Sequence, residues 1–160
     1  MQKRTVLIIV ALIVLAAGWY LFRPERAFIN EKVNEGFPAV ASASNMPVTI
    51  AEGRFHDVAH KGVGTATVFQ LPEGSRVLRF TNFETSNGPD VRVYLVAAPD
   101  SNDDATVKNA GFVEVGKLKG NVGDQNYDLP ADLDLTKFQS VTIWCARFNV
   151  NFATAPLAKM

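Results

Sequence analysis

The sequence predicts an all-β domain, an antiparallel β-sandwich or a barrel-like variant of one, preceded by one N-terminal transmembrane helix and a short stalk. Three observations predict this architecture. Apolar residues within residues 49–160 recur with a period of two rather than 3.6, which is typical of β-strands. Clusters of Gly, Pro, Asn and Asp separate these runs at short intervals. A long uncharged apolar run lies close to the N-terminus.

The apolar run extends from Thr5 to Phe22 and follows Lys3 and Arg4. At about 1.5 Å of rise per helical residue, it covers nearly the whole hydrocarbon core of a bilayer, which is about 30 Å thick. A cleaved signal peptide has a shorter apolar stretch that ends in small residues, whereas residues 19–22 here are Trp, Tyr, Leu and Phe. The run therefore favours an uncleaved membrane anchor over residues 5–22.

Charges around the run predict its orientation. Lys3, Arg4 and the terminal amine favour an N-terminus, residues 1–4, that stays in the cytoplasm. Arg23 and Arg26 on the other side reduce the difference in charge without reversing it. We expect a single-pass protein whose C-terminal domain lies outside the cytoplasm.

Residues 23–48 read as a stalk, because they combine charged residues with Pro24, Pro38, Pro47 and a tract of small residues at 39–44. Residues 25–33 within this segment are compatible with two turns of helix. The remaining residues, 49–160, are enough for one domain with its own core.

Composition excludes several classes of function. The chain has 16 Lys and Arg against 16 Asp and Glu, and this balance, with no basic stripe, argues against a nucleic-acid partner. Its single cysteine cannot form a disulfide within the chain. One cysteine and two histidines also cannot build a closed zinc site or a four-cysteine iron–sulfur cluster.

Several runs in the domain have the pattern of strands. In residues 90–96, the alternation places Val91, Val93 and Leu95 on one face. The other β-rich runs are residues 64–70, 77–83, 112–118 and 141–148. Turn-forming residues separate them at 72–74, 86–89, 99–104, 119–123 and 129–134.

The cysteine, Cys145, lies in the last of these runs beside Trp144. In a strand it shares a face with Val141 and Ile143, and free cysteine often packs as a small hydrophobe. Redox chemistry is the alternative, and it would gain from a cation such as Arg147 that lowers the pKa of the thiol. The residues alone favour packing, with redox chemistry as the alternative.

Three segments, 81–95, 116–130 and 140–148, carry a family resemblance. They read TNFETSNGPDVRVYL, GKLKGNVGDQNYDLP and SVTIWCARF, and residues 155–157 follow as APL. In this order they resemble the DM-thirteen domain, also called the electron transfer DM domain, over Glu52 to Leu157. The resemblance implies an all-β extracytoplasmic module proposed to act in electron transfer. Its characteristic cysteine would serve as a bare thiol or hold a prosthetic group such as haem.

The resemblance maps the family cysteine onto Cys145, the acidic residue of its Gly-Pro-Asp turn onto Asp90, and a histidine before the first glycine-rich strand onto His60. We expect no permanent cofactor, while Cys145 or His60 remains a chemically possible axial ligand for haem. We expect no metal site at His56 and His60, because the i, i+4 spacing aligns side chains on a helix and not on a strand.

Further binding candidates lie in the motif loops and around the cysteine. For Asp90, turn formation is the simpler interpretation. The loop 116–130 is richer in amides and glycines than a hairpin requires, and its candidates are Asp124, Gln125, Asn126 and Tyr127. Trp144 and Arg147 complete the set.

The sequence thus predicts a membrane-tethered accessory module with a redox or electron-relay role centred on Cys145. Its partners would be the membrane and a membrane-bound or extracytoplasmic redox protein. The alternative is a non-enzymatic protein- or ligand-binding sandwich in which Cys145 only packs. No pattern of nucleophile, histidine and carboxylate indicates a hydrolase or another independent enzymatic activity.

Overall fold

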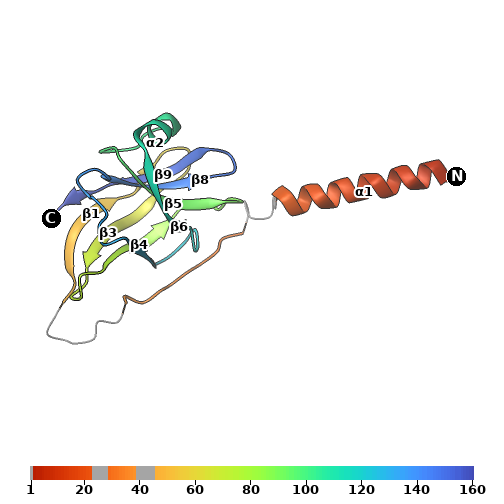
Figure 1. The fold of residues 1–160 in the computed structure, drawn as a ribbon. Helices are drawn as coiled ribbons and strands as arrows, with labels where there is room; N and C mark the ends of the chain where they lie inside the picture. Colours follow the sequence, from red (N-terminus) through yellow and green to blue (C-terminus); the bar gives the residue numbers. More distant parts are fainter. Residues whose placement is uncertain (1, 23–28, 39–45) are drawn as a thin grey trace.

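The computed structural model describes residues 2–22, 29–38 and 46–160. An N-terminal helix, α1 (Gln2–Phe22), precedes two packed five-stranded sheets (Figure 1). The first sheet has the order β10-β1-β3-β4-β7, formed by Ala158–Lys159, Val48–Arg54, Val63–Gln70, Arg76–Glu84 and Gln125–Leu129. The second has the order β2-β9-β8-β5-β6, formed by His56–Asp57, Val150–Pro156, Ser140–Cys145, Val91–Val96 and Phe112–Lys117.

Every strand pair in the two sheets is antiparallel. The sheets keep separate edges and do not join into a closed barrel, so the predicted antiparallel sandwich is confirmed in its open form. Inward-facing residues of both sheets form the main core. Phe80 lies near its centre, with Phe55, Phe83 and Tyr127 at ring-centroid distances of 5.0, 5.0 and 5.3 Å.

Strand β8 is buried along its whole length. Val141, Ile143 and Cys145 point into the main core between the sheets, as the alternation predicts. Trp144 belongs instead to a second hydrophobic cluster, with Val107 of the short helix α2 (Asp104–Ala110). Inner strands that are covered on both faces lack the usual apolar–polar alternation, and β8 shows this pattern.

Helix α2 follows the turn that the sequence predicts at residues 99–104, and the sequence did not predict the helix itself. Asp103 caps the helix, because its side chain accepts a hydrogen bond from the Thr106 backbone N–H at 2.6 Å. The helix ends at Gly111, which has a φ of 87°. Seven residues are too few for a helical period to stand out in the sequence.

Residues 29–37, within the segment that the sequence assigns to the stalk, lie in extended form against the sandwich, and we call them the strap. Lys32 pairs in parallel with Val122. The Val33 N–H donates to the Val122 carbonyl and the Glu35 N–H to the Asp124 carbonyl, both at 2.9 Å. The suggested helical turns are therefore absent from residues 29–33, while residues 25–28 lie outside the described part of the chain.

Two glycines let the strap approach this closely. Gly123 has a φ of 106°, and a Cβ there would overlap the carbonyl oxygen of Val33. A Cβ on Gly120 would lie 2.6 Å from the carbonyl oxygen of Glu31. The glycine-rich sequence of the loop is thus explained in part by the segment that crosses it.

Helix α1 contains one stretch, Gln2–Leu21, that is long and apolar enough to cross a membrane, with a mean hydropathy of 2.2. None of this stretch is buried against the rest of the structure. Its length and composition suit a membrane span and also a signal sequence.

The close approach at Gly123 predicts the effect of adding a single methyl group. Gly123→Ala should destabilise the full chain by about 1–3 kcal/mol more than Gly74→Ala, because a strained position must also displace the strap. Gly74 is the matched control, since its φ is 93° but a Cβ there meets nothing within 4 Å. Urea unfolding in detergent measures both variants, and equal destabilisation would contradict the packed strap.

Candidate functional site

Cys145 ends β8 and is fully enclosed. Its side chain is 0% exposed, and it pairs in register with Val91 of β5 and Val150 of β9. Hydrophobic side chains from both sheets surround it in the main core. The local reason is the continuous apolar run of β8, which is buried on both of its faces.

Full burial limits the chemistry of the thiol. Formation of a mixed disulfide requires direct approach of one sulfur to the other, and reactive cysteines are accordingly partly exposed. An enclosed Cys145 therefore does not reach a partner's disulfide without opening of the core. Electron exchange that breaks no bond remains compatible with this position.

Arg147 lies outside the strand that carries Cys145. Strand β8 ends at Cys145, and residues 146–149 form a turn in which Arg147 is exposed. The alternation that would direct its side chain toward the sulfur therefore stops before this residue. Asn149, which has a φ of 56°, closes the turn before β9.

Trp144 lies on the opposite face of β8 and is 4% exposed. Its indole stacks on Tyr94 of β5, with centroids 6.2 Å apart and planes inclined by 23°. Tyr94 stacks in turn on Phe112 at 4.2 Å, and Phe112 is 46% exposed. Lys108 of α2 places its ammonium 5.6 Å from the indole centroid. A row of stacked rings thus extends from the residue beside Cys145 to the protein surface.

His60 lies against the rim of the same core. Its ring is 4.0 Å from that of Phe152, a member of the core cluster that contains Cys145. Burial lowers the pKa of His60, so its imidazole is neutral at pH 7. Through Phe152, His60 thus contacts the core cluster to which Cys145 belongs.

A haem ligated by Cys145 does not fit this arrangement. The sulfur is enclosed by packed side chains of both sheets, and a macrocycle could reach it only if several of them moved away. Among residues 2–22, 29–38 and 46–160, no group of three or more His, Cys, Asp or Glu side chains could hold a metal ion.

His56 forms a polar contact with the segment before α2. Its Nε2 lies 2.9 Å from Oδ1 of Asp100, and its Nδ1 lies 3.0 Å from the Asp57 carbonyl oxygen. Burial, the largest single effect, opposes the charged ring. The hydrogen bonds of the ring with the Asp100 carboxylate and the Asp57 carbonyl, together with the charges of both aspartates, outweigh it and raise the pKa of His56. His56 is thus held in an ion pair, whereas His60 packs on an aromatic ring.

Asp90 lies in the turn directly before β5 and helps to hold this turn in place. Its carboxylate binds the guanidinium of Arg92 at 3.1 and 3.2 Å, and its backbone carbonyl accepts a hydrogen bond from Ala146 at 2.8 Å. Arg92 also binds both carboxylate oxygens of Glu114 at 2.8 Å. Asp90 therefore links the loop before β5 to the turn after β8.

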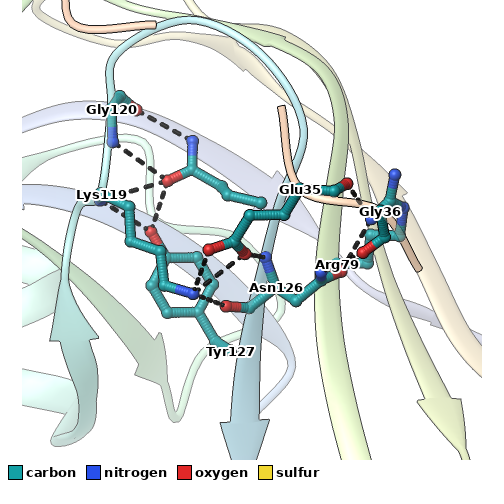
Figure 2. A network of polar contacts seen from close by, with 8 residues as sticks. Glu35, Gly36, Arg79, Lys119, Gly120, Asn126 and Tyr127 are labelled. Atoms are coloured by element: carbon teal, nitrogen blue, oxygen red, sulfur yellow. Dashed lines mark hydrogen bonds and ion pairs between the residues drawn. The ribbon is translucent and has the colours of Figure 1, made fainter. Parts of the chain in front are cut away.

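The strap occupies the loop that the sequence singled out for binding, as Figure 2 shows. The Glu35 carboxylate accepts hydrogen bonds from Lys119 Nζ at 2.8 and 2.9 Å and from the Asn126 N–H at 2.7 Å. The Asn126 side chain donates to the Gly36 carbonyl at 2.8 Å. Asp124 binds Arg79 at 2.7 Å, and Arg79 also donates to the Glu35 carbonyl.

The side chains of Gln125 and Tyr127 hydrogen-bond to each other and to the backbone of the loop at residues 119 and 120. Gln125 is fully buried. Its side-chain oxygen accepts a hydrogen bond from the Tyr127 hydroxyl at 2.6 Å, and its side-chain amide donates to the Gly120 carbonyl at 2.9 Å. Burial raises the pKa of Tyr127. Both residues belong to strand β7, so the second half of the expected loop is a strand.

Sequence reasoning missed Glu35, Arg79 and Tyr94. Glu35 lies in the segment assigned to the stalk, and no local pattern links it to Lys119, 84 positions away. Arg79 lies in a strand whose alternation was visible, but the alternation does not show which face would receive the strap. Tyr94 was visible as a strand residue, and its stacking depends on the register between β5 and β8.

The fold and the site define a class of protein: an antiparallel sandwich, linked to an apolar N-terminal helix, whose single cysteine is enclosed next to a stacked tryptophan. The family model described as Electron transfer DM13 matches residues 54–157, and the chain belongs to this family. Neither the curated proteins nor the solved structures give a significant match to the chain.

The enclosure of Cys145 predicts slow labelling. Iodoacetamide should modify the native full chain far more slowly than the unfolded chain, because the sulfur is 0% exposed. Cys145→Ser should cost about 1–3 kcal/mol of stability through a buried hydroxyl, with Cys145→Ala as the apolar control. Mass spectrometry and urea unfolding measure these effects, and rapid labelling of the native chain would contradict the enclosed position.

The ion pair of Glu35 predicts a pH dependence. A hydrogen bond from Lys119 lowers the pKa of Glu35, so the carboxylate stabilises the folded state above the ordinary glutamate pKa of about 4.3. This contribution is lost as the pH falls through the lower folded pKa. Stability of the wild-type chain should exceed that of Glu35→Gln by under about 1 kcal/mol near pH 7, a small value because both groups are partly exposed.

The difference between wild-type and Glu35→Gln unfolding free energies should shrink as the pH falls from about 5 to 3. High salt at pH 7 should also reduce it, since partly exposed ion pairs are screened. A difference that stays constant across this pH range would show that Glu35 does not hold the strap through its charge.

Proposed function

We propose that this chain is a membrane-tethered accessory module of an electron-transfer system, with its sandwich outside the cytoplasm. The family match over residues 54–157 supports an electron-transfer role, and α1 supports the tether. Lys3 and Arg4 before α1 support the outward orientation of the domain. Within the sandwich, β8 is the redox strand, and its two candidate centres are Cys145 and Trp144.

The single observation that carries this mechanism is the enclosed Cys145 beside the stacked Trp144–Tyr94 pair. Burial prevents mixed-disulfide formation but does not prevent transfer of single electrons, which requires no contact between the reacting atoms. Aromatic rings in close stacking provide a continuous path for such a transfer. Phe112 then brings the stack to the edge strand β6, where a partner can approach.

The two centres differ in their proton chemistry. An indole that gives one electron to an oxidised metal centre or flavin of a partner becomes a radical cation, and no bond breaks. A thiol that gives one electron also releases its proton, and Cys145 has hydrophobic neighbours in the main core. Lys108, 5.6 Å above the indole, disfavours the radical cation and so raises the potential at which Trp144 is oxidised.

A second candidate function rests on a cavity of about 470 Å³ between the strap, the end of β4 and residues 122–124. Its lining includes Lys32 and Asn34 of the strap, Asn82 and Glu84 of β4, and Asp124. Cavities of this volume accommodate small ligands. In this alternative the domain binds a ligand or protein, and Cys145 serves only in packing.

A flash-photolysis experiment tests the redox strand. A photo-oxidised ruthenium complex takes one electron from the full chain in detergent, and transient absorption reports whether an indole, phenol or thiol radical forms. We expect oxidation of the wild-type chain to produce an indole radical cation, or a thiyl radical after loss of the thiol proton. This radical should decay as Tyr94 returns one electron to it and gives up its phenol proton, to the thiyl sulfur or to water, which leaves a tyrosyl radical. Trp144→Phe or Cys145→Ala should remove most of this signal, and the affected variant identifies the centre.

Trp19→Phe is the matched control, because Trp19 is the other tryptophan and lies in α1, outside the sandwich. It should leave the transfer to Tyr94 unchanged. If neither β8 variant alters the radical signal, β8 is not the redox strand and the binding alternative is favoured.

A further inference from the structure

The strap fixes which end of the sandwich lies nearest to the end of α1. Six residues, 23–28, separate Phe22 from Ile29, where the strap begins. Because a residue spans at most about 3.6 Å, Ile29 lies within about 25 Å of the last residue of α1. The 21 residues of α1 nearly match the thickness of the hydrocarbon core, so α1 ends close to the lipid headgroups.

Ile29 is connected by hydrogen bonds to the end of the sandwich that contains Cys145. Its carbonyl accepts a hydrogen bond from the Asn87 side chain at 3.0 Å. Asn87 belongs to the loop that continues to Asp90, whose carbonyl accepts the Ala146 N–H at 2.8 Å. Ala146 begins the turn between β8 and β9. Figure 1 shows this turn and the start of the strap on the same side of the domain.

This end exposes apolar side chains of the kind that enter a membrane interface. Phe148, in the β8–β9 turn, is 55% exposed, and Ile29 is 60% exposed. Arg147, also exposed, adds a cation beside Phe148. Exposed aromatic and aliphatic side chains next to basic residues are typical of segments that lie in the interface between lipid headgroups and acyl chains.

Exposure alone does not select this end, because Val48, Phe112 and Met160 are exposed at the other end of the sandwich. The short connection to α1 selects the end of the sandwich that contains Cys145. It keeps Ile29 within about 25 Å of the end of α1, whereas the turn after β3 lies at the opposite end of the domain.

We propose that the β8–β9 turn, with Phe148 exposed, rests on the headgroup surface of the bilayer that holds α1. The inference rests on the tether in the proposed function and extends it with an orientation. In this position the end of β8 that carries Cys145 lies next to the membrane, and Phe112, at the outer end of the aromatic row, lies on the side away from it.

Spin labels on the full chain test this orientation. The chain is reconstituted into vesicles of phosphatidylcholine and phosphatidylglycerol, and a label is attached through Phe148→Cys. Glu73→Cys is the matched control, in the exposed turn between β3 and β4 at the opposite end. Wild-type chain treated with the same reagent supplies the background from Cys145.

For each label we compare collisions with oxygen, which concentrates in lipid, and collisions with a water-soluble nickel chelate. We expect the ratio of oxygen to nickel collisions to be several-fold higher for the label at position 148 than for the label at position 73. If the chain floats with the vesicles but both labels are equally accessible to the nickel chelate, the proposed orientation is wrong. This result would not contradict the membrane tether or the redox role of β8. Lipid accessibility at position 73 would also overturn the orientation.

Flotation separates this inference from the proposed function. Wild-type chain that does not float with vesicles would overturn both the tether and the orientation. The flash-photolysis result in detergent does not depend on a bilayer, so it reports on the redox strand alone.

Discussion

The burial of β8 on both faces is the constraint on which the rest of the structure depends. Its inner residues fill the core between the sheets, and Trp144 on its outer face packs with Tyr94 of β5 and Val107 of α2. A strand in this position tolerates few polar atoms, and its buried hydroxyl groups are hydrogen-bonded. Oγ1 of Thr142 lies 3.1 Å from Oγ1 of Thr154, and Oγ of Ser140 lies 3.1 Å from Oγ of Ser101. The same enclosure places Cys145 beyond the reach of another thiol.

The strap gives the domain a second constraint that acts at the surface. Its backbone pairs with residues 122–124, and Glu35 binds Lys119 and Asn126 (Figure 2). The amides and glycines of residues 116–130 therefore have structural partners within the chain. Since the strap begins only a few residues after α1, the contacts that attach it to the sandwich also restrict how far the domain can move from the helix.

The sequence predicted the sandwich because alternation and turn residues are local signals, and five of its strands were visible as such. It did not predict α2, which is too short to show a period, or β7, whose Gln125, Asn126 and Tyr127 have the composition of a loop. The position of Cys145 on the inner face followed from the spacing to Val141 and Ile143. The contacts of Trp144 with Tyr94 and of Glu35 with Lys119 depend on register and on pairing between distant segments, which one sequence does not contain.

The account depends most on β8 remaining buried throughout the native state, without local opening. Hydrogen exchange of the full chain tests this directly. If β8 stays buried, the amides of Ser140–Cys145 exchange only through global unfolding. Their opening free energy then equals the free energy of urea unfolding, and it falls with urea concentration at the same slope. Exchange through a local opening of much lower free energy, insensitive to urea, would contradict the account, because such an opening would expose Cys145 to direct thiol chemistry.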